Sequence, residues 1–199
     1  MPQRSSDTPA PGRRLDRAAW AAAALDALST GGIAAVAVEP IAARLGATKG
    51  SFYWHFPSRD ALVEAALDLH ARRSTDDVIA ELDALDDPAQ RLVRLFDHVF
   101  RRGHAGRAEL ALLSHADDRL VAPVLARMTR RRVDYLDRLY RDLGLPDAEA
   151  RRYAVLAYTA YTGVVQAQRA AGGRLFGSAA ERSAYVDFLL PMLTPRRPE

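Results

Sequence analysis

Residues 37–56 decide the fold, and they read AVEPIAARLGATKGSFYWHF. Apolar residues at helical spacing predict a short helix over residues 38–45 and a second one from residue 48 to about residue 54. Gly46 lies between them and can adopt the left-handed backbone conformation that a tight turn needs. Two short helices joined in this way form a helix-turn-helix.

The second helix of this motif begins with small polar groups and one cation, which suits close entry into the major groove of DNA. The aromatic and imidazole groups at its far end can donate hydrogen bonds to phosphates. The candidate DNA contacts are Thr48, Lys49, Gly50, Ser51, Tyr53, Trp54 and His55, with Arg44 and Arg59 on the flanks. Arg13 and Arg14 are further candidates for the minor groove or the backbone. The alternatives are a solvated charge for Lys49 and packing against the first helix for Trp54 and His55.

The rest of the chain also follows helical periodicity, and no useful stretch alternates like a strand. The sequence therefore predicts an all-α fold of about nine helices. We expect a disordered arm over residues 1–12, a DNA-binding domain over residues 13–73, and a C-terminal helical bundle over residues 74–199. The arginine pair before the alanine-rich run 18–28 could mimic an export signal, but an ordinary first helix is the better interpretation.

Charge is unevenly placed along the 199 residues, which carry 28 basic and 25 acidic side chains for a net charge of +3. Residues 1–59 hold seven basic and four acidic groups, so the whole net charge lies in the segment with the helix-turn-helix. A cationic face attracts the DNA backbone. The chain has no cysteine, which excludes disulfides and thiolate chemistry.

The N-terminal third resembles the DNA-binding domain of tetracycline-repressor-type (TetR) regulators. The resemblance rests on Gly31-Gly32-Ile33, Ile41-Ala42, Leu45-Gly46, Thr48-Lys49-Gly50, residues 52–56 (FYWHF) and residues 58–62 (SRDAL). Two positions depart from the family pattern: Ala37 stands where a capping Ser or Thr is common, and Arg59 stands where Lys is usual. The resemblance implies a homodimeric regulator that binds a palindromic operator and is released by a small molecule.

The C-terminal bundle should then hold an effector pocket. One face of the predicted helix over residues 147–171 mixes aromatic and polar groups, and apolar residues of neighbouring helices could complete the site. The candidate ligand contacts are Phe96, Phe100, Leu113, Met128, Tyr135, Tyr158, Thr159, Thr162 and Gln166. The alternative is an ordinary core in which the hydroxyls bond back to the preceding turn.

A second face of that helix carries mostly small residues and suits close helix packing, as does an apolar stripe on the last helix. The candidate dimer contacts are Leu156, Ala160, Gly163, Ala167, Tyr185, Phe188, Leu189 and Met192, with packing inside one protomer as the alternative. We expect the run Arg130–Arg132 to form a solvated face with acidic partners. His98, His104 and His115 are expected at the surface or in the core, although His104 and His115 could reach a pocket.

No glycine-rich phosphate loop, metal signature or nucleophile motif is visible, so we expect no enzyme activity, cofactor or metal. The expected partners are double-stranded DNA, a second copy of the chain and a mainly apolar effector, in the cytoplasm and without a membrane. Two alternatives remain open: a ligand-independent regulator, and an activator with the same fold.

Overall fold

The computed structural model describes residues 16–101 and 107–194, and within them it contains helices and no strand. The all-α expectation is therefore confirmed. The helices are α1 (Arg17–Gly31), α2 (Val38–Leu45), α3 (Lys49–His55), α4 (Arg59–Ala71), α5 (Asp77–Asp83), α6 (Pro88–Phe96), α7 (Arg107–Leu113), α8 (Val121–Asp142), α9 (Asp147–Ala170) and α10 (Ala179–Leu193). The expectations for the arm, for Arg13 and Arg14, and for His104 lie outside the described residues.

Three irregular helical turns complete the order. A 3-10 turn, η1 (Ile33–Ala35), follows α1. The π-helical turn η2 (Arg72–Asp76) joins α4 to α5 as one continuous helical run, and a second π turn, η3 (Asp97–Arg101), extends α6. π turns inside helices often lie at functional sites. Here η2 marks the point where the chain leaves the N-terminal helices.

Side-chain caps explain where several helices begin. Asp16 accepts a hydrogen bond from the Ala19 N–H at 2.8 Å, and Thr48 accepts one from the Ser51 N–H at 3.1 Å. Ser58, Asp87 and Ser178 cap α4, α6 and α10 in the same way. As expected from the sequence, Ala37 gives α2 no side-chain cap.

The helix-turn-helix is fixed by buried aromatic rings. Gly46 ends α2 with φ +65°, in the left-handed region that the turn requires. Phe52 and Phe56 of the α3 segment are completely buried, and the Phe52 ring centroid lies 5.5 Å from that of Trp20 on α1. These contacts hold the inner side of α3 against α1 and leave its other side to solvent.

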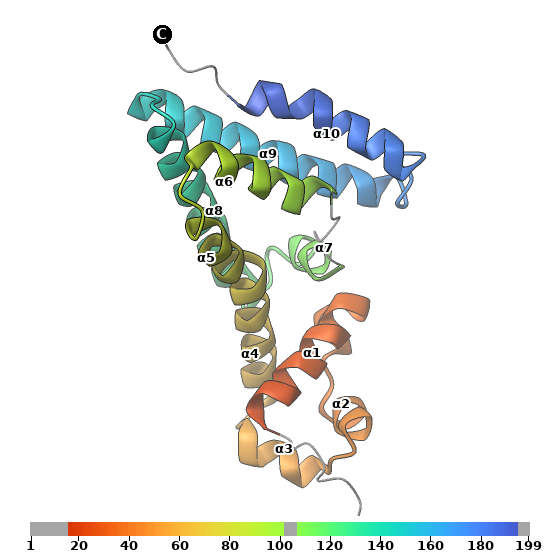
Figure 1. Cartoon of the computed structure of the whole chain (residues 1–199). Coiled ribbons are helices and arrows are strands. Elements are labelled where there is room, and N and C mark those ends of the chain that lie inside the picture. Colours follow the sequence, from red (N-terminus) through yellow and green to blue (C-terminus); the bar gives the residue numbers. More distant parts are fainter. Residues whose placement is uncertain (1–15, 102–106, 195–199) are drawn as a thin grey trace, which may run out of the picture.

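Two hydrophobic cores follow one another along the molecule. The first combines α1–α4 with α7 and the start of α8, through residues such as Leu112 and Val121. The second combines α5, α6, the end of α8, α9 and α10. Figure 1 shows α1–α3 at one end and α9 and α10 at the other, with α8 running between them. The first core therefore continues well past residue 73, and α7 and α8 pack against both parts of the chain.

Candidate nucleic-acid interface and effector cavity

The outer side of α3 presents polar and aromatic groups to solvent. Thr48, Lys49 and Gly50 are exposed at its start. Tyr53 is 57% exposed and Trp54 is 90% exposed. The exposed indole and phenol lie side by side in the sequence, on a helix that Phe52 anchors to the core, so this side of α3 is free to contact a partner. Ser51 and His55 are half-buried.

Lys49 forms an ion pair within the motif. Its Nζ lies 2.8 Å from a carboxylate oxygen of Glu39 on α2, and both side chains are exposed. The hydrogen bond and the attraction between them raise the pKa of Lys49 and lower the pKa of Glu39. Because both groups face water, the pair holds Lys49 weakly, and a phosphate can replace Glu39.

Arg44 and Arg59 are turned toward the protein. Arg44 donates to the Ala23 carbonyl of α1 at 2.6 Å and to Asp26 at 3.3 Å. Arg59 donates to the Val36 carbonyl at 2.7 Å and to a second carbonyl in the same turn. Both residues thus stabilise the loop and helices that position α3. To contact DNA, either guanidinium would have to bind a phosphate while also donating to these carbonyls.

Sequence reasoning missed Arg17, which joins α1 to the end of α3. Its Nη1 donates to the His55 carbonyl at 2.8 Å, and its guanidinium lies 4.3 Å from the centroid of the Phe56 ring. An unpaired helix-terminal carbonyl and an adjacent aromatic ring are partners that an arginine often finds. The spacing of 38 residues between Arg17 and His55 hides this contact from any local pattern.

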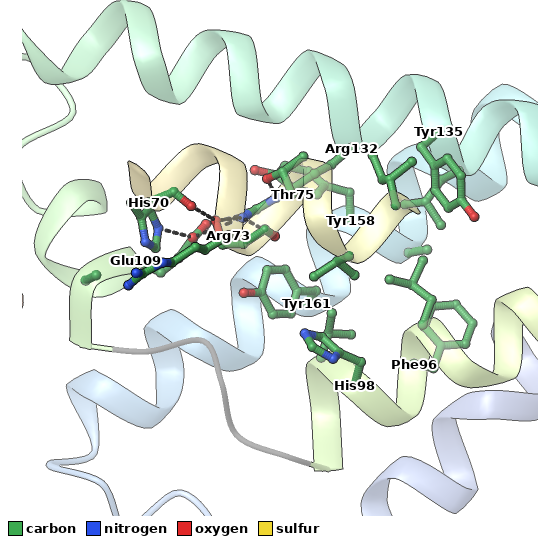
Figure 2. A pocket seen from close by; sticks show the side chains of 18 of the residues that line it. His70, Arg73, Thr75, Phe96, His98, Glu109, Arg132, Tyr135, Tyr158 and Tyr161 are labelled. Atoms are coloured by element: carbon green, nitrogen blue, oxygen red, sulfur yellow. Dashed lines mark hydrogen bonds and ion pairs between the residues drawn. The ribbon is translucent and has the colours of Figure 1, made fainter. Parts of the chain in front are cut away.

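A cavity of about 490 Å³ lies where the two cores meet. Leu25 and Ser29 of α1 line it from the N-terminal side, while residues of α5, α6, α8 and α9 line it from the other. This volume is within the range of small-molecule sites. Figure 2 shows charged residues gathered on one side of the cavity and the rings of Phe96 and Tyr135 on the opposite side.

The charged side is organised around Glu109 on α7. One of its carboxylate oxygens accepts a hydrogen bond from Arg132 of α8 at 2.6 Å, and the other lies 3.1 Å from Nε2 of His70 on α4. Arg132 also donates to Thr75 Oγ1 at 2.9 Å and to Ser74 Oγ at 3.1 Å, both in η2. The network therefore ties α4, η2, α7 and α8 together beside the cavity.

Glu109 is ionised in this setting. Burial by itself would raise its pKa, but the hydrogen bond with His70 and the charge and hydrogen bonds of Arg132 outweigh burial and lower the pKa to about 2. The same carboxylate raises the pKa of the Arg132 guanidinium, against the effect of burial. A buried pair of this kind is stable only while both partners are present.

Only some of the expected ligand contacts line the cavity, namely Phe96, Tyr135 and Tyr158. The others lie elsewhere. Met128 and Leu113 pack in the first core, and Phe100 packs in the second. The Thr159 and Thr162 hydroxyls donate to backbone carbonyls one turn earlier in α9, as the alternative interpretation proposed. Gln166 is exposed to solvent. The residues that were expected at the ligand site but do not line this cavity are therefore Phe100, Leu113, Met128, Thr159, Thr162 and Gln166.

The expectation of a solvated face at Arg130–Arg132 needs correction at Arg132. Its side chain is only 14% exposed and enters the buried network, because its position on α8 faces the cavity. Arg130 and Arg131 are exposed as expected, and Arg131 lies 3.6 Å from Asp76. His115 is exposed and packs beside Gly32 at the end of α1.

The outer face of α9 and α10 exposes large apolar side chains. Leu156, Phe188 and Met192 are each half or more exposed in the single chain. Tyr185 and Leu189 are half-buried. Ala160, Gly163 and Ala167 line a groove between the two helices, with Tyr185 at its side. Exposed large apolar side chains beside a groove suit a protein–protein interface.

In the described part of the chain, no helix is both long and apolar enough to cross a membrane. No group of three or more candidate ligand residues comes close enough to hold a metal ion within those same residues.

The segment that contains the helix-turn-helix matches a known protein family. Residues 21–66 match the family described as bacterial regulatory proteins, tetR family. The matched segment contains α2 and α3, so the helix-turn-helix is of the type found in these DNA-binding transcription regulators.

Several solved structures share the fold of most of the chain. Escherichia coli NemR in its reduced form is 13% identical and superposes with a TM-score of 0.74 over 92% of this chain and 99% of that one. A TetR transcriptional regulator from Legionella pneumophila is 14% identical, with a TM-score of 0.73 over 92% and 100% of the two chains. A regulator from Saccharomonospora viridis in complex with choline is 20% identical, with a TM-score of 0.68 over 88% and 95%. A search of curated protein sequences finds no match.

Proposed function

We propose that the protein is a homodimeric transcription repressor that binds a palindromic operator through α3 and releases it when a small molecule occupies the cavity. The observation that carries this proposal is the position of the cavity between the two cores. A ligand there would touch α1 of the DNA-binding part and the helices of the C-terminal bundle at the same time.

Contact with DNA is assigned to the exposed side of α3. Thr48, Lys49, Gly50 and Ser51 would approach the bases and phosphates, and Tyr53, Trp54 and His55 would contact the flanking backbone. Lys49 would exchange its exposed partner Glu39 for a phosphate. We assign Arg44 and Arg59 a bracing role, because both already donate to backbone carbonyls.

Dimerisation is assigned to the outer face of α9 and α10. The exposed apolar side chains Leu156, Phe188 and Met192 would be buried against the same face of a second copy. Such a two-fold contact makes a four-helix interface and presents two α3 helices to the two halves of a palindrome.

A ligand-responsive regulator is favoured over a ligand-independent one by the cavity volume of about 490 Å³. A ligand-independent protein of this fold would be expected to fill that space with side chains. The choline complex of the Saccharomonospora viridis protein supports the proposal, because a chain of similar fold was solved with a small molecule.

The proposal is tested by footprinting the DNA upstream of the protein's own gene with wild type and with Lys49→Ala. We expect two protected half-sites related by a two-fold axis, with centres about 34 Å or more apart, and weaker protection by the variant. A reporter gene behind this DNA should be less active when the protein is expressed. Protection without sequence preference, or a reporter that rises, would contradict the repressor proposal.

A further inference from the structure

The cavity is electrostatically asymmetric. Its lining includes one acidic residue, Glu109, and two arginines, Arg73 and Arg132. Apolar side chains such as Val78, Ile79 and Val99 line much of the remainder. The site therefore combines an apolar region with one end that carries an excess positive charge.

The single carboxylate has little capacity left for a cation. Both oxygens of Glu109 are engaged, one by Arg132 and the other by His70 and Arg132 together. Its side chain is only 3% exposed. A cationic ligand would have to displace these hydrogen bonds, at a cost that its own charge would recover only in part.

Hydrogen-bond donors, in contrast, remain available at the same end. Arg73 is exposed and lines the cavity, and it makes no hydrogen bond or ion pair within the described chain. The Tyr161 hydroxyl likewise makes no hydrogen bond there, and Figure 2 shows it pointing toward the charged side of the cavity. A guanidinium and a phenol are donors that suit a carboxylate.

We infer that the effector is an organic anion, a carboxylate on an apolar body, held at its charged end by Arg73 and the Tyr161 hydroxyl. The apolar body lies among Phe96, Val99 and Tyr135. This inference rests on the proposed effector site and names the chemical class that the site selects. The aromatic rings alone would also suit a quaternary ammonium ion, but the excess of arginine and the engaged Glu109 oppose a cation.

The test uses three probes that share one body and differ only in charge: phenylbutyrate, phenylbutanamide and phenylbutylamine. Binding to the full chain is measured by isothermal titration calorimetry without DNA, at about pH 7.5, where the acid and the amine are both ionised. We expect the carboxylate to bind about tenfold more tightly than the amide, as one charge-assisted hydrogen bond provides, and the amine to bind most weakly.

Variants at Arg73 and Tyr161 then test whether these two donors cause the preference for the carboxylate. Arg73→Gln removes the charge and should abolish the preference of the carboxylate over the amide. Arg72→Gln is the matched control, because Arg72 lies on the same turn and is exposed like Arg73 but does not line the cavity. Tyr161→Phe keeps the ring and should weaken carboxylate binding severalfold while leaving the free energy of unfolding unchanged.

Tightest binding of the amine, equal binding of all three probes, no binding of any probe, or an Arg73→Gln protein with the full preference would each overturn the inference. Since DNA is absent from the assay, failure of operator binding would leave this result intact. A protein that binds its operator but shows no carboxylate preference would overturn the ligand class alone.

Discussion

The Glu109 carboxylate of α7 accepts a hydrogen bond from the Arg132 guanidinium of α8 at 2.6 Å, inside the protein and at the wall of the cavity. The same carboxylate contacts His70 of α4, the helix that leads directly from α3 into the body of the molecule. Glu109 therefore links α7 to α8 through Arg132 and to α4 through His70. If the cavity is the effector site, as we propose, a ligand that disturbs these contacts would be felt at α4, the helix that follows the helix-turn-helix.

Replacing Glu109 should destabilise the protein strongly. Glu109→Gln leaves the buried Arg132 charge without its counterion, and we expect the free energy of unfolding to fall by about 3–5 kcal/mol. Urea denaturation followed by circular dichroism measures the change.

The control for this prediction is an exposed pair of similar geometry. Arg151 lies 3.0 Å from Asp134 on the surface, and Arg151→Gln should cost less than about 1 kcal/mol. Equal losses in the two variants would show that burial does not set the strength of the Glu109–Arg132 pair.

Acid should unfold the protein partly through Glu109. Its pKa is about 2 in the folded chain against 4.5 for an unperturbed glutamate, so the unfolded state binds a proton first as the pH falls. The stability that this carboxylate contributes is present above about pH 4.5 and is lost between about pH 4.5 and pH 2. The free energy of unfolding of wild type should therefore fall more steeply across this window than that of Glu109→Gln. Parallel curves would contradict the assignment.

Lys49 should contribute one phosphate contact to operator binding. Lys49→Ala is expected to weaken binding and to reduce the slope of log affinity against log salt by about one unit. Fluorescence anisotropy of a labelled operator at several salt concentrations measures both quantities.

Glu39→Gln is the opposing control for Lys49. It removes the exposed partner at 2.8 Å without touching the lysine, so operator affinity should rise or stay equal. Loss of affinity in Glu39→Gln would show that the ion pair positions Lys49 for DNA rather than competing with it.

The face of α9 and α10 should mediate dimerisation. Phe188 is 62% exposed, and Phe188→Glu would place a charge in the proposed interface, so we expect a shift from dimer to monomer in light scattering. Val93→Glu is the matched control, because Val93 is 53% exposed on α6 and does not line the groove between α9 and α10. A dimer that survives Phe188→Glu would contradict the proposed interface.

The helix-turn-helix could be predicted from sequence because its determinants are local. Gly46, Phe52 and Phe56 act within a few residues of one another, and their burial follows from helical spacing. The helix boundaries that capping residues set, as at Ser58 and Asp87, were equally accessible.

The charged wall of the cavity could not be predicted in the same way. Glu109 lies 39 residues from His70 and 23 residues from Arg132, and each of these side chains is ordinarily found at a surface. Only the packing of α4, α7 and α8 buries them together. Phe96, Tyr135 and Tyr158 could be predicted, because aromatic residues on inward faces are common in cavities. The prediction failed for Thr159 and Thr162, because their hydroxyls donate to backbone carbonyls of α9 itself.

The most direct test of the account is the affinity of the footprinted operator measured by anisotropy with and without saturating phenylbutyrate. We predict that the carboxylate weakens wild-type binding at least about fivefold, within the usual range of allosteric coupling, and has much less effect on Arg73→Gln. An unchanged operator affinity, while calorimetry shows the same carboxylate bound to the protein, would contradict the claim that the cavity controls DNA binding.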